Sequence, residues 1–390
     1  MKRKWALPCV AVLILACSTA GSHGGRVSKP EIDNELDGIT CPSPSHCIAV
    51  GSVRNYNTSE EYQTLIEENT GSGWTIAPSP TVSGGLGSTL SGVACAGTTH
   101  CIAVGSSMDR TSIRKTLIEE NTGSGWAIVP SPNPSAFGAD NDNGSLAGVT
   151  CASATHCIAV GAYESDNGSF QNLIEEYTGA TWAIVPTPNS SGTDNNLLNK
   201  VACTSSGRCV AVGSYRDSNA LIEENTGGGW AIVPVDSPGY LSDVSCAGPT
   251  YCISVGFFGS ILVGGQPLIV ENAGTWRMTP AADALGALSG VTCASATNCI
   301  AVGNYAGGLD PLIEQKIGNA WMPVPRLNIS SSEPYSLKLN GAACAGGGHC
   351  LIVGAQFIGA STVSKTIIVE NIGSVWAPVS SPNINRGPLV

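Results

Sequence analysis

Apolar residues occur along the chain in short runs rather than in long stretches, and the arrangement of these runs repeats about every 50 residues. Each copy begins with a Leu five residues before a Cys, as in 90–95. A second Cys follows, and after it comes an apolar run that ends in Gly, as in 101–105. The chain contains seven such copies, which begin at Leu36, Leu90, Leu146, Leu198, Leu241, Leu288 and Leu339.

Each copy continues with a Leu-Ile type pair and acidic residues, as in 117–123, and then with a Trp and a further apolar segment, as in 127–130. The four runs of a copy are rich in Val and Ile, are bounded by turn residues and are too short for helices. Each run therefore predicts a β-strand. Four strands per repeat is typical of a propeller blade.

The repeats thus predict an all-β fold, a seven-bladed β-propeller with four antiparallel strands per blade. This domain is expected over residues 36–382, with a tail at 383–390. The alternative is a β-solenoid, whose repeats are usually shorter and whose strands form hairpins less often.

Composition narrows the class of protein. The 390 residues include 48 Gly and 23 Pro, which disfavour helix interiors, and only 12% of the residues are charged where about 25% is ordinary. The mean hydropathy is only +0.13, so the chain is neither a disordered polyelectrolyte nor a multi-pass membrane protein. The net charge of −11 argues against a nucleic-acid partner.

The first residues read as an export signal. Three basic residues at 2–4 precede an apolar run at 6–16, which is too short to span a bilayer. We therefore expect a signal peptide at 1–16 and an exported protein.

The end of this apolar run, Leu-Ile-Leu-Ala-Cys at 13–17, resembles the bacterial lipobox. The resemblance implies acylation of Cys17, a lipidated tether at 17–35, and attachment to the outer face of the cell membrane through the lipid alone. The alternative is cleavage after Ser-Thr-Ala at 18–20, which would leave a free secreted protein.

Fourteen of the sixteen cysteines form seven pairs with five residues between the two members. Zinc sites usually use shorter spacings or bring two pairs together, whereas one pair at the mouth of each predicted hairpin favours a local disulfide. Such bonds require an oxidising compartment, in agreement with export. The predicted disulfides join Cys41 to Cys47, Cys95 to Cys101, Cys151 to Cys157, Cys203 to Cys209, Cys246 to Cys252, Cys293 to Cys299 and Cys344 to Cys350.

The turn before the Trp repeats as Asn-x-Gly-x-x-Trp in four copies, at 69–74, 121–126, 225–230 and 371–376. This spacing resembles the Asp-box of sialidase-type and related secreted bacterial propellers, with Asn in place of Asp. In those families the box is structural, so the resemblance implies kinship of fold and not sialidase chemistry. Other copies depart from the pattern, with Tyr177, Lys316 and a turn one residue shorter before Trp276.

Two recurring polar positions invite a metal hypothesis. A Glu lies three residues before the turn Gly in six copies, with Gln315 in the remaining one, and a His precedes the second Cys in four. A ring of these groups could bind a cation such as calcium. We favour a structural role, in which each Glu accepts hydrogen bonds from a neighbouring turn.

The run at 140–144 has alternating oxygen ligands like those of a calcium loop but lacks the distal Glu. We therefore expect a solvated turn there and no metal site. We expect no cofactor other than, at most, calcium.

The turns of the predicted blades divide into two rims. The first and third turns of each blade are uniform and share one rim, whereas the second turns and the links between blades vary in length and share the other, which we call the variable rim. All five Phe and seven of the nine Tyr fall in these variable segments, as a binding surface would require. The candidate binding residues are Tyr56, Tyr62, Arg110, Phe137, Phe170 and Phe257.

Some of these aromatic residues have a simpler explanation. Four of them share one position, two residues after the Gly that ends the second run, and are expected to pack against a core instead: Tyr163, Tyr215, Phe258 and Tyr305.

Three functions remain open at this point. The first is a monomeric, non-catalytic propeller that binds a glycan or a protein, favoured because no Gly-x-Ser-x-Gly, His-Glu-x-x-His or phosphate-loop motif occurs. The second is a glycan-cleaving enzyme, because two rim carboxylates could form a catalytic pair. The third is a structural component of the envelope. The carboxylates available to an enzyme are Glu60, Glu61, Asp109, Glu164, Asp166 and Asp217, and the arginines of the second turns are Arg54, Arg110, Arg114 and Arg216.

Overall fold

The computed structural model describes residues 32–56, 62–82, 84–134, 143–204, 207–216, 219–235, 237–259, 265–305, 310–324, 327, 335–346, 348–358, 363–372 and 375–384. The predicted signal peptide, Cys17 and most of the predicted tether lie outside these residues. The described residues form 28 strands and contain no helix that is long and apolar enough to cross a membrane.

The strands follow one another in sets of four, which correspond to the seven sequence repeats. Repeats 1 to 4 comprise β1 (Ile32–Ser43), β2 (His46–Asn55), β3 (Tyr62–Asn69), β4 (Trp74–Ala77), β5 (Gly87–Cys95), β6 (Cys101–Met108), β7 (Arg114–Asn121), β8 (Trp126–Val129), β9 (Gly144–Ser153), β10 (His156–Glu164), β11 (Phe170–Tyr177), β12 (Trp182–Ile184), β13 (Asn196–Cys203), β14 (Cys209–Tyr215), β15 (Asn219–Asn225) and β16 (Trp230–Ile232). Repeats 5 to 7 comprise β17 (Tyr240–Cys246), β18 (Cys252–Phe258), β19 (Gln266–Asn272), β20 (Trp276–Thr279), β21 (Ala287–Ser295), β22 (Asn298–Asn304), β23 (Pro311–Ile317), β24 (Ala320–Pro323), β25 (Tyr335–Ala345), β26 (His349–Ile358), β27 (Ser364–Ile372) and β28 (Val375–Val379).

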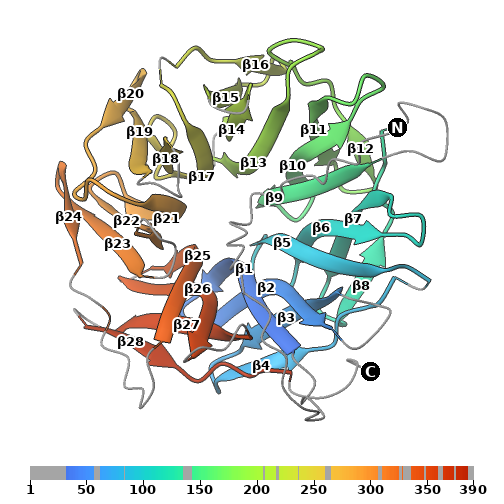
Figure 1. Cartoon of the computed structure of the whole chain (residues 1–390), viewed down its shortest axis with the longest axis horizontal. Coiled ribbons are helices and arrows are strands. Elements are labelled where there is room, and N and C mark those ends of the chain that lie inside the picture. Colours follow the sequence, from blue (N-terminus) through green and yellow to red (C-terminus); the bar gives the residue numbers. More distant parts are fainter. Residues whose placement is uncertain are drawn as a thin grey trace, which may run out of the picture.

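The sheets radiate from a common centre, so the chain has a β-propeller fold with repeated blades (Figure 1). Repeats 3 to 7 each form one four-stranded sheet, whereas β1 to β8 form one eight-stranded sheet. Among the described residues, one parallel pair joins the two halves of this larger sheet, Tyr62 with Gly87. The first strand of each repeat lies innermost, with β1 meeting both β5 and β25 (Figure 1).

The recurring Leu and Gly of the sequence are explained by a bulge in each innermost strand. In repeat 2, Leu90 pairs with Gly105, and the register shifts immediately after Leu90. A Cβ atom on Gly105 would lie 1.9 Å from the carbonyl oxygen of Thr89. Only glycine fits so close to a neighbouring backbone. The recurring Gly of the sequence is therefore explained by close contact between the first two strands of each repeat.

The hydrophobic cores lie between successive repeats. Ile48, Val50 and Ile66 of repeat 1 pack with Leu90 and Trp126 of repeat 2, and the same arrangement continues around the ring. A flat sheet cannot bury its apolar face alone, so each repeat depends on its neighbours.

The ring closes by packing of repeat 7 against repeat 1. Leu351 and Ile368 share a core with Leu36, Trp74 and the buried Ile384. The structured region is therefore longer at both ends than the sequence pattern indicates. The first strand starts before Leu36, and Ile384 lies in the segment expected as a tail.

All seven predicted disulfides are present, each joining the first two strands of its repeat with Cα atoms 4.0–4.1 Å apart. In most repeats the two cysteines are also direct cross-strand partners, as Cys95 and Cys101 are. The bonds suggest an extracellular or secreted protein, because disulfides persist in oxidising compartments.

Candidate functional site

Two of the predicted binding residues meet on the variable rim of repeat 1. Arg54 lies near the end of β2 and is the cross-strand partner of Tyr62, while Tyr56 begins the turn between them. The guanidinium carbon of Arg54 lies 4.3 Å from the ring centroid of Tyr56 and 5.1 Å from that of Tyr62. These are cation–π distances, so one arginine organises both tyrosines.

A carboxylate anchors this group to the rest of the ring. The hydroxyl of Tyr56 donates a 2.7 Å hydrogen bond to Asp33 Oδ2, and Arg54 donates to the same hydroxyl over 3.2 Å. Asp33 Oδ1 in turn accepts a 2.8 Å bond from the backbone N–H of Ser364 in repeat 7. Burial and the Asp33 carboxylate raise the pKa of Tyr56 to about 12, so the phenol stays neutral. We call Asp33, Arg54, Tyr56 and Tyr62 the tyrosine cluster.

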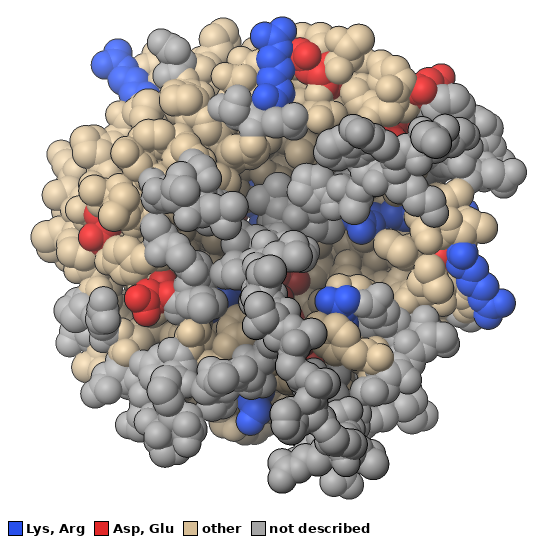
Figure 2. Space-filling model, in the orientation of Figure 1, with Lys and Arg blue, Asp and Glu red and all other residues tan. Residues whose placement is uncertain are grey.

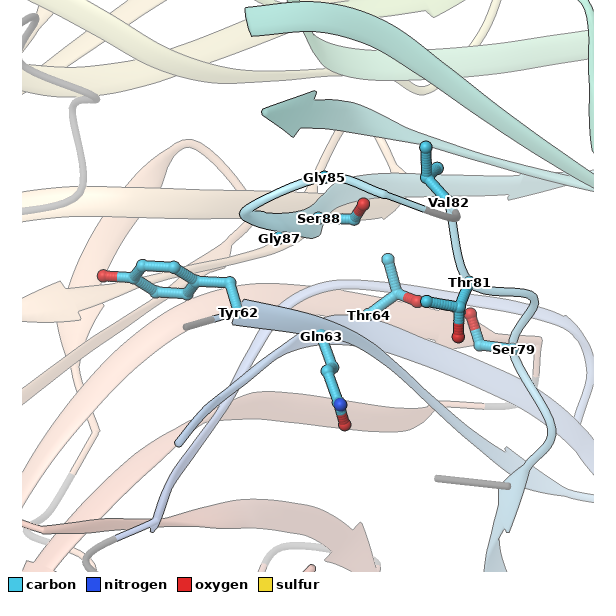
Figure 3. A pocket seen from close by; sticks show the side chains of 9 residues that line it. All are labelled: Tyr62, Gln63, Thr64, Ser79, Thr81, Val82, Gly85, Gly87 and Ser88. Atoms are coloured by element: carbon cyan, nitrogen blue, oxygen red, sulfur yellow. The ribbon is translucent and has the colours of Figure 1, made fainter. Parts of the chain in front are cut away.

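A pocket adjoins the tyrosine cluster, between the start of β3 and the segment that leads into β5 (Figure 3). Its floor is already hydrogen-bonded, since the hydroxyls of Thr64 and Ser79 lie 2.6 Å apart and Ser79 donates to Glu119. The described lining residues carry no charged side chain: they are Tyr62, Gln63, Thr64, Ser79, Thr81, Val82, Gly85, Gly87 and Ser88. In Figure 3 the ring of Tyr62 points away from the Thr64 and Ser79 end, so it borders the pocket rather than filling it.

Repeat 5 has a groove at the equivalent place on the variable rim. It lies between the start of β19 and the link that follows β20, and it includes Phe258, Pro267, Pro280 and Met278, whose side chain is 47% exposed. The groove is more apolar than the pocket of repeat 1. Both hollows thus occur where the second turn meets the interblade link, the region that the sequence marks as variable.

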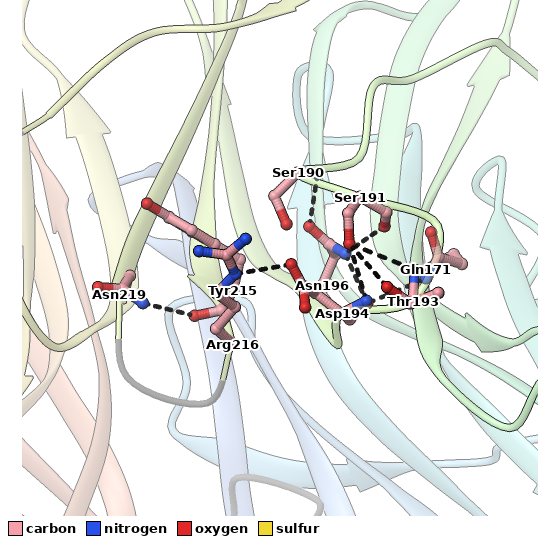
Figure 4. Close-up of polar contacts among 9 residues, drawn as sticks. All are labelled: Gln171, Ser190, Ser191, Thr193, Asp194, Asn196, Tyr215, Arg216 and Asn219. Carbon is pink, nitrogen blue, oxygen red and sulfur yellow. Dashed lines mark hydrogen bonds and ion pairs between the residues drawn. The ribbon is translucent and has the colours of Figure 1, made fainter.

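A polar network occupies the same rim at repeats 3 and 4 (Figure 4). Arg216 Nε donates a 2.7 Å bond to Asp194 Oδ2, and this bond holds the pKa of Asp194 below its ordinary value. Two further hydrogen bonds fix the backbone of Asp194. Its N–H donates to Ser191 Oγ over 3.0 Å, and its carbonyl oxygen accepts from Asn196 Nδ2 over 2.8 Å. Arg216 has a positive φ of 51°, which is rare outside glycine, so these contacts hold a strained residue at the surface.

The other predicted binding residues are dispersed among the repeats. Arg110 is exposed in the turn between β6 and β7, and Phe170 is half-buried at the start of β11. Phe257 is only 8% exposed and stacks on Tyr240, with ring centroids 5.0 Å apart. Its ring therefore packs within repeat 5 instead of facing solvent. Phe137 lies outside the described residues.

The four aromatic residues expected to pack do so, each against a hydrophobic core: Tyr163, Tyr215, Phe258 and Tyr305. Two of the described carboxylates considered for catalysis, Asp109 and Glu164, accept hydrogen bonds from neighbouring residues. Asp109 accepts bonds from the backbone N–H groups of Thr111 and Ile113, and with the Thr111 hydroxyl these hold its pKa low. Glu164 accepts a 2.9 Å bond from Asn143. Asp166 is exposed, and Glu60, Glu61 and Asp217 lie outside the described residues.

The recurring Glu and His form contacts within and between repeats. His100 lies 2.7 Å from Glu120, and His156 and His349 meet Glu176 and Glu370 in the same way. The indole N–H of the next repeat's Trp also reaches this column, as Trp126 does to Glu68 over 2.7 Å and Trp276 to Glu224. These contacts support the structural interpretation of the column. Among the described residues there is no group of three His, Cys, Asp or Glu that could hold a metal ion.

The turn before the Trp is closed by its Asn. The side-chain oxygen of Asn69 accepts the N–H of Gly71 over 2.9 Å, and Asn121 and Asn225 repeat this contact. Asn272 does the same with Gly274, although its turn is one residue shorter. Asx turns of this kind explain why an Asn and a Gly recur two residues apart.

A charged group lies on the propeller axis and was not among the predicted sites. The second residue after the first Leu of each repeat is Gly in five repeats, but Lys200 in repeat 4 and Asp243 in repeat 5. Lys200 Nζ reaches across to the carbonyl oxygen of Ser91 in repeat 2 over 3.3 Å. Asp243 Oδ2 accepts the N–H of Val291 in repeat 6 over 2.8 Å. In the aligned repeats, Lys200 and Asp243 stand where the other five repeats have Gly. This difference could have identified the two charged residues from the sequence.

The axis also carries acidic groups near the ring closure. Burial and the neighbouring Glu35 raise the pKa of Asp37 to about 7, while Lys338 and Lys200 act in the opposite direction. Asn340 of repeat 7 donates 2.8 Å bonds to Glu35 Oε1 and to the carbonyl of Leu36. Acidic and basic groups from several repeats thus act on one another near the axis. Figure 2 shows acidic and basic side chains scattered over the described part of one face, without a large patch of one sign.

Comparison with known proteins supports the fold alone. No family model and no curated protein matches the chain. Among solved structures, YCF48 bound to D1 peptide aligns with a TM-score of 0.50 and 11% identity, over 84% of this chain and 92% of that one. The Hadza microbial sialidase Hz136 aligns with a TM-score of 0.49 and 12% identity, over 84% of this chain and 75% of that one. The six-bladed fucose-binding lectin of Aleuria aurantia aligns with a TM-score of 0.41 and 12% identity, over 90% and 95% of the two chains.

Proposed function

We propose that this protein is an exported, non-catalytic β-propeller that binds a glycan or a protein through its variable rim. The observation that carries the proposal is the tyrosine cluster, in which Arg54 holds Tyr56 and Tyr62 together while Tyr56 remains 49% exposed. An exposed aromatic group with fixed geometry is typical of a binding surface. The groove of repeat 5 on the same rim supports the same interpretation.

Retention experiments test this proposal. The purified, oxidised protein is passed over immobilised cell-envelope polysaccharides and over purified envelope proteins, with and without calcium, and released sugars are measured at the same time. We expect retention without release, weakened when Tyr56 and Tyr62 are both replaced by Ala. The matched control is Val375→Ala, since Val375 is 63% exposed at the start of β28, on the uniform rim. Release of sugar would contradict a non-catalytic role, and retention unaffected by the double replacement would contradict the rim.

We further propose that the ring has seven blades. The eight-stranded sheet would then comprise two blades, because β1–β4 and β5–β8 each repeat the strand order of the other sheets. In the described part of the chain, these two sets share only the Tyr62–Gly87 strand pair. The Asn turns before the Trp support kinship with Asp-box propellers. An experimental structure that merged these eight strands into one continuous blade would contradict the count.

We also propose that Cys17 is acylated and holds a monomeric protein at the outer face of a bacterial cell membrane. The seven disulfides support an oxidising compartment, and the lipobox-like sequence at 13–17 supports the anchor. Radiolabelled palmitate would be incorporated by the native chain and not by Cys17→Ser, and light scattering of the detergent-free form would give the mass of one chain. Equal labelling of both chains would contradict the assignment.

A further inference from the structure

The structure points to a neutral sugar as the ligand of the tyrosine cluster, and we propose that one pyranose ring stacks on Tyr56. This inference rests on the rim-binding function proposed above and assigns its ligand class. It starts from the two faces of the Tyr56 ring. Arg54 lies over the ring with its guanidinium carbon 4.3 Å from the centroid and therefore covers one face. Tyr56 is 49% exposed, and since Arg54 covers one face of its ring, we infer that the opposite face and the edges are open to solvent.

The ring is also held in a fixed orientation. Its hydroxyl donates to Asp33 Oδ2 over 2.7 Å and accepts from Arg54, so rotation of the side chain would break two bonds. Arg54 is itself positioned by its second contact, to the ring of Tyr62. An aromatic face that is rigid before the ligand arrives loses little conformational entropy on binding. The C–H groups on one face of a pyranose carry partial positive charge and complement the negative face of such a ring.

Sugar hydroxyls require a polar neighbour beside the aromatic face. Asp33 supplies one, because each carboxylate oxygen has two lone pairs and Oδ2 uses one of them for Tyr56. The backbone N–H of Ser364 fixes this carboxylate through Oδ1 over 2.8 Å. A hydroxyl of a sugar stacked on Tyr56 can therefore donate to Asp33 Oδ2.

The charges of the cluster favour an uncharged ligand. Arg54 and Asp33 have opposite charges and meet at the same tyrosine hydroxyl, so their charges largely compensate each other. The described residues that line the adjoining pocket are all uncharged. A carboxylated or sulfated sugar would bring a negative charge towards Asp33 without a second cation among the described residues of the cluster, and like charges at short range are unfavourable. The cluster thus selects a neutral sugar.

The test compares neutral with acidic polysaccharides and uses the full, oxidised chain. Immobilised galactan, mannan, xyloglucan and fucosylated oligosaccharides represent neutral sugars, and hyaluronan and polygalacturonate represent acidic ones. We expect binding to at least one neutral probe and to neither acidic probe. Tyr56→Ala should weaken this binding at least tenfold. Tyr56→Phe should weaken it less than Tyr56→Ala, because the ring remains but loses the two bonds that orient it. Val375→Ala should leave the binding unchanged. Circular dichroism of each variant reports the folded state.

Each contrary result has a separate meaning. Binding to a neutral sugar that survives Tyr56→Ala in a folded protein overturns the assignment of Tyr56 but leaves the rim function standing. Binding only to acidic polysaccharides, or only to a purified envelope protein, overturns the ligand class and again leaves the rim function. Retention by neither polysaccharide nor protein overturns both proposals.

Discussion

The hydroxyl of Ser381 donates a 2.9 Å hydrogen bond to Glu67 Oε2, which joins residues 314 positions apart across the closure of the ring. The same contact recurs between neighbouring repeats, from Ser79 to Glu119 and from Ser131 to Glu175. Each of these glutamates is fully buried. The last repeat is therefore joined to the first by the contact that joins consecutive repeats.

We expect Ser381→Ala to destabilise the fold, because it leaves the buried Glu67 carboxylate without this donor. The loss of a hydrogen-bond partner from a buried group costs about 1–3 kcal/mol. Thermal unfolding at pH 8.5 measures the effect, and Ser79→Ala is the matched control within the chain. Similar losses in both variants would show that the closure is equivalent to the other junctions. A Ser381→Ala protein as stable as the native one would contradict this view.

The buried glutamates predict an unusual dependence of stability on pH. Burial raises the pKa of Glu67, Glu119 and Glu223 to about 7 and that of Glu175 to about 8, from an ordinary value of 4.5, and it also raises the pKa of Glu314. Between pH 4.5 and 8 the folded state therefore binds more protons than the unfolded state. Its stability falls as the pH rises through this window and levels off above pH 8. Each group contributes about 1.4 kcal/mol to this fall for every tenfold difference between its acid dissociation constants in the folded and unfolded states.

Melting temperatures measured from pH 5 to pH 8.5 check this prediction. The hydrogen-bonding partners of these glutamates are uncharged. Two hydroxyl groups lie beside each of three glutamates: Thr64 and Ser79 beside Glu119, Thr116 and Ser131 beside Glu175, and Thr366 and Ser381 beside Glu67. Glu223 has the hydroxyl of Thr187 and the side-chain amide of Asn172. Among charged neighbours, Asp283 faces Glu314 and raises its pKa further. Glu119→Gln should flatten part of the slope because glutamine does not titrate. A melting temperature that rises with pH over this range would refute the assignment.

Lys200 should be needed for the stability of the axis. Burial raises the pKa of both Asp37 and Asp243, and the ammonium group of Lys200 opposes this rise. Lys200→Met therefore removes a stabilising cation from both carboxylates and leaves Lys338 beside Asp37. We expect a loss of about 2 kcal/mol, less than the 3–5 kcal/mol of a fully buried pair, because the axial groups are only partly buried. Chemical denaturation measures the loss, and Lys115→Met, at an exposed position of β7, is the control. Equal stability of the two variants would exclude this role.

Gly105→Ala should disrupt repeat 2 severely. The added Cβ would lie 1.9 Å from the carbonyl oxygen of Thr89, a separation that no side-chain movement can relieve. We expect a loss above about 3 kcal/mol or failure to fold, measured by thermal unfolding. Gly192→Ala is the control, because a Cβ there meets nothing within 4 Å. Normal stability of Gly105→Ala would mean that the innermost strands are farther apart than the structure indicates.

The strands and disulfides were predictable because they depend on local patterns. The Leu90 and Gly105 columns record direct backbone contact, and each Cys pair spans a single hairpin. The burial of Glu67 and its equivalents was not predicted. Each of them directly precedes a residue of the more conspicuous Glu68 column, and adjacent residues of a strand point to opposite faces of the sheet. Only the three-dimensional stacking of repeats shows that one face is buried and the other partly exposed.

The candidate site was predictable only in part. The rim and its two tyrosines follow from topology and from the hairpin that pairs Arg54 with Tyr62. The role of Asp33 could not be predicted, because its partner Ser364 is 331 residues away and meets it only when the ring closes. Phe257 differs, because it stacks on its cross-strand partner Tyr240 in the same hairpin, and the sequence shows the pairing but not that the two rings cover each other.

Asp33 belongs to the tyrosine cluster through Oδ2 and to the closing junction through Oδ1, and this double membership has a thermodynamic consequence. A ligand that binds best when Asp33 is held by Ser364 must favour the closed ring, and by reciprocity the closed ring must favour the ligand to the same degree. Loosening the junction would therefore reduce affinity without touching the binding surface. Occupancy of the site would in turn stabilise the ring against opening at the junction where its first and last repeats meet.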